Sequence, residues 1–254
     1  MVGSINFIKE VFKLDTKIEE LTSLLENSYH EVSKGFNGDL HGTMLFLTPP
    51  MKNCSVLIFG RNPEGLEDNR CDFFENKDLK ENEMAFIESQ RNCIIENNSR
   101  FDMGIIKLFC LAYHGLDKKG CWYKNKTVKD EECPGIEVLK HNSVVAELIP
   151  FRTNENKNWK KLISYLNSKT EDGESVSEKY CVPIINKLIA YTNPKVIITL
   201  GDETIYYFNK WLKNIDIKVY SFSHPSERRL TDETIIQEAQ ELRKVLPFEE
   251  IKQF

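Results

Sequence analysis

The sequence predicts an α/β protein in which a central four-stranded parallel sheet lies between two layers of helices. Four short apolar runs rich in β-branched residues predict the strands, at positions 56–59, 144–149, 196–200 and 219–222. Three of these runs lack strict alternation of apolar and polar residues, which is typical of strands buried on both faces of a parallel sheet. Helical patterns separate the later runs, and this alternation favours right-handed crossovers and three layers.

The helices are predicted from capping residues and apolar periodicity. Thr16 and Glu19 form a capping-box signature that opens the first helix. Further helices are expected near 78–96 and 101–113, in a long segment that is otherwise polar and rich in turn residues. The last three are expected over 180–191, 203–212 and 232–245, each with apolar side chains on one face.

The composition is that of a globular chain with a substantial core, because 41% of the residues are apolar and 29% are charged. We expect one domain over residues 1–254, with an N-terminal helical extension over about 1–53 and an insertion between the first two strands over about 66–142. The net charge of -5 argues against a protein that coats nucleic acid non-specifically. It leaves room for a local basic patch.

The cysteines and the N-terminus indicate the cellular setting. Seven cysteines form no C-x-x-C pair, so neither a disulfide framework nor a zinc or iron-sulfur site is favoured. No apolar run approaches the roughly 20 residues that span a bilayer, and the first residues lack a signal-peptide pattern. We therefore expect a cytoplasmic protein with reduced thiols and no membrane partner.

Polar segments follow the ends of all four predicted strands. They are GRNPEG at 60–65, PFRTN at 150–154, GDE at 201–203 and SHPSERR at 223–229. In parallel α/β sheets, ligands bind beyond the carboxyl ends of the strands. The sequence therefore predicts a single site at that edge, built from segments far apart in the chain.

The order of these motifs resembles the uracil-DNA glycosylase superfamily. A strand ending in G-x-N-P, a segment A-E-L-I-P-F, a strand P-K-V-I-I-T-L-G and a last strand ending in H-P-S before arginines are most similar to the mismatch-specific and single-strand-selective branches. The resemblance implies hydrolysis of a base from deoxyribose without a metal or organic cofactor. It also implies that Asn62 holds the attacking water and that His224 stabilises the departing base.

These residue types suit the chemistry. Breaking an N-glycosidic bond develops positive charge on the sugar and negative charge on the base, so a neutral amide can orient water and a neutral imidazole N–H can donate to the base. The enzyme must also extrude the base and clamp the backbone. Candidates for binding the base are Gly60, Phe73, Phe74 and Glu147, and candidates for contacting DNA are Arg61, Pro63, Pro225, Ser226, Arg228 and Arg229.

Glu147 departs from the resemblance, because it stands where an asparagine is usual. An ionised carboxylate only accepts hydrogen bonds, which suits the N4 amino group of cytosine better than uracil. We therefore expect the excised base to be a cytosine derivative, such as one with a bulky C5 substituent in bacteriophage DNA. The competing interpretation is that the strand alignment is shifted and that Glu147 pairs with Arg152 or Lys161.

Other functions remain open. An ordinary uracil-DNA glycosylase and a catalytically inactive DNA-binding protein of the same fold are the main alternatives. A dinucleotide-binding enzyme is disfavoured because G-R-N-P-E-G differs from G-x-G-x-x-G, and a zinc deaminase is disfavoured because H-x-E and P-C-x-x-C are absent. Phe73 and Phe74 could instead belong to the core. We expect the protein to act as a monomer on DNA that contains an altered base.

Overall fold

The computed structural model describes most of the chain outside the predicted insertion. The described residues are 16–61 except 39, 44, 47 and 49, then 142–224 except 154 and 155, then 232–246, and the single positions 105, 108, 109, 111, 112 and 138. Several predicted site residues lie outside these ranges, namely Asn62, Pro63, Phe73, Phe74, Pro225, Ser226, Arg228 and Arg229.

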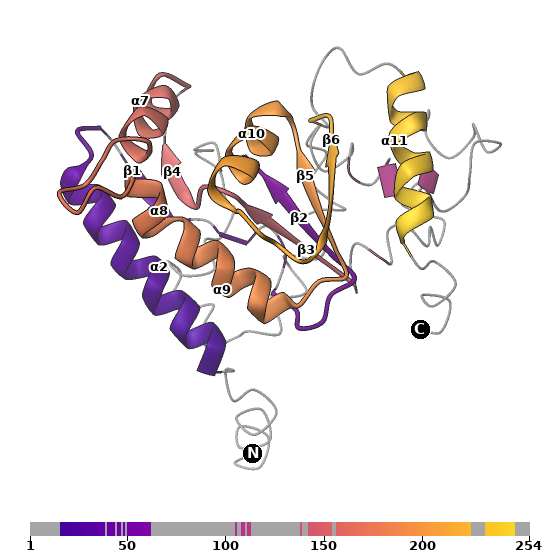
Figure 1. Cartoon of the computed structure of the whole chain (residues 1–254), viewed down its shortest axis with the longest axis horizontal. Coiled ribbons are helices and arrows are strands. Elements are labelled where there is room, and N and C mark those ends of the chain that lie inside the picture. Colours follow the sequence, from indigo (N-terminus) through magenta and orange to yellow (C-terminus); the bar gives the residue numbers. More distant parts are fainter. Residues whose placement is uncertain are drawn as a thin grey trace, which may run out of the picture.

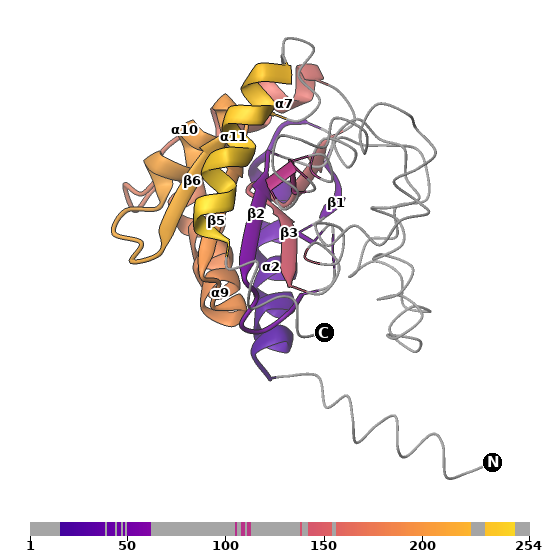
Figure 2. The same cartoon turned by 90° about the vertical axis from the view of Figure 1, so that its right-hand side faces the viewer.

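A four-stranded parallel sheet forms the centre of the molecule, as predicted. Its strands are β2 (Val56–Gly60), β3 (Ser143–Glu147), β5 (Val196–Leu200) and β6 (Lys218–Phe222). They lie side by side in the order β3-β2-β5-β6, which Figure 2 shows across the face of the sheet. Every residue of β2, β3 and β5 is buried, whereas β6 is partly exposed because it lies at the edge of this sheet.

Helices cover both faces of the sheet, so the three-layer architecture is confirmed. On one face lie α2 (Thr16–Gly35), α7 (Asn156–Leu166), α8 (Val176–Tyr180), α9 (Val182–Thr192) and α10 (Asp202–Trp211), and on the other lies α11 (Asp232–Val245) (Figure 1). Side chains of β2 alternate between the layers. Leu57 and Phe59 join the first cluster, and Val56 and Ile58 join the second.

A second, two-stranded antiparallel sheet was not expected from the sequence. It pairs β1 (Leu40–Thr43) with β4 (Phe151–Thr153). The residues after β1 then run along the outer edge of β3, where Val145 N donates to Thr48 Oγ1 at 2.7 Å and Glu147 N donates to Leu45 O at 2.8 Å. These bonds satisfy backbone groups that an open edge strand would leave unpaired.

Several predicted boundaries were wrong. The second strand ends at Glu147 rather than at Ile149, because Leu148 and Ile149 bend towards the end of β2. The helix predicted over 180–191 is α9, but the short helix α8 before it was missed, although Ser175 and Glu178 form a capping box that starts α8 and Pro183 lies in the first turn of α9. Helix α7 was missed.

The N-terminal helix α2 belongs to the main core. Leu21, Leu25 and Val32 are fully buried in the cluster that includes strand residues of the sheet. Within the predicted helix near 101–113, the five described residues are helical and buried on the opposite face. The helix predicted near 78–96 lies outside the described residues. None of the helices in the described ranges combines the length and the apolar character needed to cross a bilayer.

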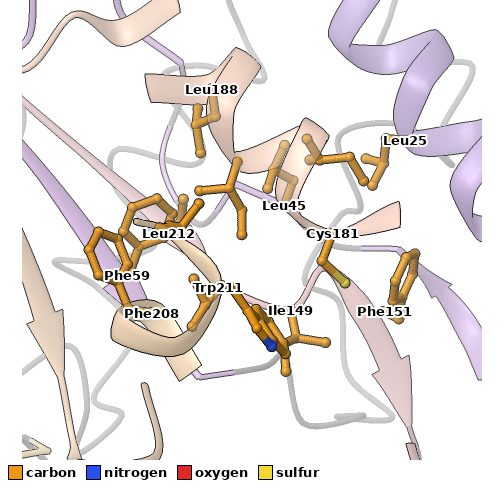
Figure 3. Packing of buried hydrophobic residues seen from close by; sticks show 14 of the residues in the cluster. Leu25, Leu45, Phe59, Ile149, Phe151, Cys181, Leu188, Phe208, Trp211 and Leu212 are labelled. Carbon is orange, nitrogen blue, oxygen red and sulfur yellow. The ribbon is translucent and has the colours of Figure 1, made fainter. Parts of the chain in front are cut away.

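The larger core contains aromatic side chains and two thiols, and Figure 3 shows Cys181 among its neighbours. Phe59 of β2 and Phe208 of α10 lie with ring centroids 5.6 Å apart. Cys54 and Cys181 are free and buried, and burial raises the pKa of Cys54 to about 12 and that of Cys181 further. Both thiols are therefore protonated at neutral pH and act as small apolar groups.

Phe208 should be an anchor between α10 and the sheet. We expect Phe208→Ala to lower the free energy of unfolding by about 3–5 kcal/mol, because it removes a buried ring and leaves a cavity. Tyr206→Ala is a matched control on the same helix, since Tyr206 is 58% exposed, and it should cost less than about 1 kcal/mol. Urea denaturation of both variants checks this, and equal losses would contradict the packing described.

Candidate functional site

The carboxyl ends of the parallel strands gather the described candidate residues at one edge. Gly60 ends β2, Glu147 ends β3, Gly201 follows β5 and His224 follows β6. The chain runs from β2 to β3 on one side, then crosses back past β2 to β5 on its other side and continues to β6, so the sheet reverses its winding between β2 and β5. Such a switch point is where open parallel sheets form ligand crevices.

The backbone of Gly60 lies against the carboxylate of Glu147. The two residues are partners in the parallel register of β2 and β3. A Cβ atom added to Gly60 would lie 2.7 Å from Glu147 Oε2 and 3.3 Å from its Cδ. Because the Glu147 residue is only 6% exposed, its carboxylate has little room to move away. A side chain at position 60 would therefore crowd this carboxylate, and glycine avoids the contact.

Glu147 is the last residue of β3. Its backbone N–H donates to Leu45 O, and Leu148 N donates to Gly60 O at 3.0 Å, so the strand end is fixed on both sides. Within the described residues, neither Arg152 nor Lys161 forms an ion pair with Glu147. The competing interpretation of a surface ion pair is not supported.

His224 packs on a glycine at the start of α10. Gly201 has a φ of +89°, and a Cβ atom there would lie 3.0 Å from His224 Cβ and 3.3 Å from its Cδ2. Gly201 N donates to Phe222 O at 2.8 Å, and Ser223 N donates to Glu238 Oε1 of α11 at 2.7 Å. Hydrogen bonds with Gly201 and with Glu238 of α11 therefore hold the backbone that leads into His224.

Arg61 joins the end of β2 to two helices. Its Nη1 lies 2.9 Å from Glu203 Oε2 in the first turn of α10, and its guanidinium lies over the Trp159 ring of α7, 4.8 Å from the centroid. The ion pair is partly exposed and is worth up to about 1 kcal/mol, whereas the stacking on an almost buried ring adds about 0.5–2 kcal/mol. These contacts fix the residue that precedes Asn62.

Trp159 and Glu203 are the site residues that sequence reasoning missed. Glu203 lies in the GDE segment at the strand edge, but nothing in the sequence links it to Arg61. Trp159 is buried at one face of an amphipathic helix, which is the usual pattern of a core residue. Only the arrangement of β2, α7 and α10 brings these side chains together.

The described residues contain no group of three or more histidine, cysteine, aspartate or glutamate side chains arranged to hold a metal ion. No protein-family model matches this chain, and no curated protein sequence matches it. Functional inference therefore depends on the residues and their geometry.

The contact between Gly60 and Glu147 can be tested with a double-mutant cycle. Gly60→Ala should lower the free energy of unfolding by about 1–3 kcal/mol through overpacking. In a Glu147→Ala background the same change should cost at least about 1 kcal/mol less, because the crowding carboxylate is gone.

Gly173→Ala is the matched control for this cycle. Gly173 differs from Gly60 in having a positive φ, of +85°, so alanine there strains the backbone, but nothing lies within 4 Å of its added Cβ. Its cost should be the same with or without Glu147. Strictly additive effects of Gly60→Ala and Glu147→Ala, measured by urea denaturation, would show that the close contact has no energetic weight.

Proposed function

We propose that this protein is a monofunctional DNA glycosylase that flips out an altered pyrimidine and hydrolyses its bond to deoxyribose. The observation that carries the proposal is the buried carboxylate of Glu147 held against the Gly60 backbone, at the edge of the sheet where His224 also lies. The motif order that resembles the uracil-DNA glycosylase superfamily supports the same function. The protein would act as a cytoplasmic monomer without a cofactor.

The spacing of the strands supports a pocket for one base. Glu147 ends the outer strand β3 and His224 follows the other outer strand, β6, and these two strands are separated by three interstrand spacings, about 14 Å in total. A pyrimidine that hydrogen-bonds at both ends fits between side chains that project inward from these two strands. In this arrangement Glu147 recognises one edge of the base and His224 donates to the other.

The proposed reaction uses an amide and an imidazole. Asn62 orients a water molecule towards the sugar carbon as the bond to the base lengthens. A neutral His224 donates an N–H to the developing negative charge on the base, which lowers the barrier to its departure. The anchoring of Arg61 by Glu203 and Trp159 supports this role for the adjacent residue, because a catalytic group must be held in place.

The identity of the base is proposed from Glu147. An ionised carboxylate accepts a hydrogen bond from the N4 amino group of cytosine, but it cannot donate to O4 of uracil. Because ordinary cytosine must be refused, the pocket would select a cytosine modified at C5, and the protein would act against phage-type DNA. Uracil repair is the alternative, and its mark would be rapid release of uracil.

A catalytically inactive DNA-binding protein of the same fold is the other alternative. The Gly60–Glu147 contact does not favour it, because burying a carboxylate is costly and a protein that only holds the DNA backbone has no use for it. Binding to altered-base DNA without any base release would identify this case.

The catalytic assignment predicts that Asn62→Ala and His224→Ala each reduce base release, with His224→Ala costing about 10²- to 10³-fold in rate. Both variants should still bind DNA. His30→Ala, an exposed position on α2, is the matched control and should keep full activity. Alkaline cleavage at abasic sites measures the product, and wild-type turnover in both variants would refute the assignment.

The mechanism is also tested chemically. Hydrolysis by a positioned water needs neither a metal nor a covalent adduct, so activity should persist in EDTA and borohydride should trap no protein–DNA product.

The double variant Arg228→Ala with Arg229→Ala should instead weaken DNA binding and reduce its salt dependence.

The base assignment predicts that the wild type releases C5-modified cytosine from duplexes and leaves plain uracil and plain cytosine in place. Glu147→Asn should lose this activity and gain measurable release of uracil, because an amide both donates and accepts. Glu26→Gln, an exposed change on α2, is the control. Rapid release of uracil by the wild type, with no action on any cytosine derivative, would indicate ordinary uracil repair.

A further inference from the structure

Arg152 is the middle residue of β4, and its side chain is poorly satisfied. Its neighbours Phe151 and Thr153 are buried, whereas Arg152 lies on the opposite face of the strand and is partly exposed. The Nε atom is shut off from solvent and has no hydrogen-bond partner. Among the described residues, no carboxylate forms an ion pair with its guanidinium.

An unsatisfied arginine at a partly buried position is unfavourable for the protein alone. A buried donor without an acceptor loses its hydrogen bond to water and gains nothing in return, and the loss is larger when the group is charged. An apolar side chain of similar length would avoid this cost. An unsatisfied group of this kind in a native protein needs a cause, such as backbone strain, a catalytic role, or a water molecule or ion that completes the bonding.

Arg152 lies at the same edge of the sheet as the candidate site. Strand β4 follows directly from the end of β3, where Leu148 N and Ile149 N donate to the carbonyl oxygens of Gly60 and Arg61. After β4 the chain enters α7 (Figure 1). The Trp159 ring of α7 packs on Arg61. The chain therefore contacts the end of β2 both before Arg152, through Leu148 and Ile149, and after it, through Trp159.

The two described arginines at this edge differ in their partners. Arg61 is neutralised by Glu203 at 2.9 Å and stacks on Trp159, so its position is set by the protein. Arg152 has neither kind of contact in the described part of the chain. Its guanidinium is thus the one of the two that has its bonding capacity available for a ligand.

We propose that Arg152 binds a backbone phosphate of the DNA substrate beside the candidate site. The inference rests on the proposed function, since it names a contact to the same substrate. The two non-bridging oxygens of a phosphodiester match the fork of N–H donors in a guanidinium. The phosphate meets the exposed part of Arg152, and a rotation of the side chain brings the Nε–H into the same fork. Such a contact positions the DNA without recognising its sequence.

The test is a salt titration of binding to a duplex that contains an abasic site, which measures binding without turnover. Arg152→Met should make the slope of log K against log salt concentration shallower by about 0.9, the change expected for one lost phosphate contact in duplex DNA. Arg152→Lys should keep the slope, because it keeps the charge. Lys213→Met is the matched control, since it removes an exposed cation that follows α10, away from the carboxyl edge, and it should leave the slope unchanged.

Thermal unfolding of the free protein separates a binding role from a structural one. If Arg152 serves to bind a ligand and does not stabilise the fold, the Arg152→Met variant should unfold at the wild-type melting temperature or higher. A lower melting temperature together with an unchanged salt slope would show that the arginine is structural, and it would overturn the proposal.

A parallel assay of base release separates this inference from the proposed function. If the wild type releases a base and Arg152→Met keeps the wild-type slope, only the inference fails. If the wild type binds the duplex but releases no base from any substrate, the glycosylase function fails, while a shallower slope in Arg152→Met still supports the phosphate contact. If the wild type binds no DNA, both fail.

Discussion

The in-register pairing of β2 with β3 is the constraint on which the candidate site depends. A slip of one residue would turn the side chain of Glu147 to the other face of the sheet and would remove it from Gly60. Two features hold the register. The buried side chains of both strands alternate between two separate core clusters, and the segment after β1 hydrogen-bonds along the outer edge of β3.

This scaffold has to tolerate local features that destabilise it. Gly201 has a left-handed backbone, Glu147 is a buried carboxylate and Arg152 has an unsatisfied donor, and all three lie near the carboxyl edge of the sheet. Each opposes folding by itself. The two core clusters on either face of the sheet offset these costs, so a stable framework supports an edge that carries several locally unfavourable features.

The sequence predicted the elements whose signal is local. The four sheet strands and α11 were found because an apolar run or a helical period is visible without the rest of the fold. Strands β1 and β4 have four and three residues and depend on pairing with each other, so they carry too little pattern to be recognised. Helix α8 had a local signal, the Ser175–Glu178 capping box, which was overlooked.

The candidate site was predictable as a set of strand ends but not as a set of contacts. Gly60, Glu147 and His224 could be named because each follows a recognisable strand. Their packing partners could not be named, because the contact between Arg61 and Glu203 joins residues 142 positions apart and depends on how α10 lies over β5 and β2. Register and helix placement follow from tertiary packing, which no short stretch of sequence contains.

The order of the strands bears on how this fold can change. Glu147 and His224 follow strands at opposite edges of the sheet, with β2 and β5 between them. Substitutions separated by more than about 7–10 Å, with no shared partner, generally have independent effects. Substitutions at the end of β3 can therefore change the surroundings of Glu147 without disturbing the packing of His224 on Gly201, so the two ends of this edge can vary independently of each other.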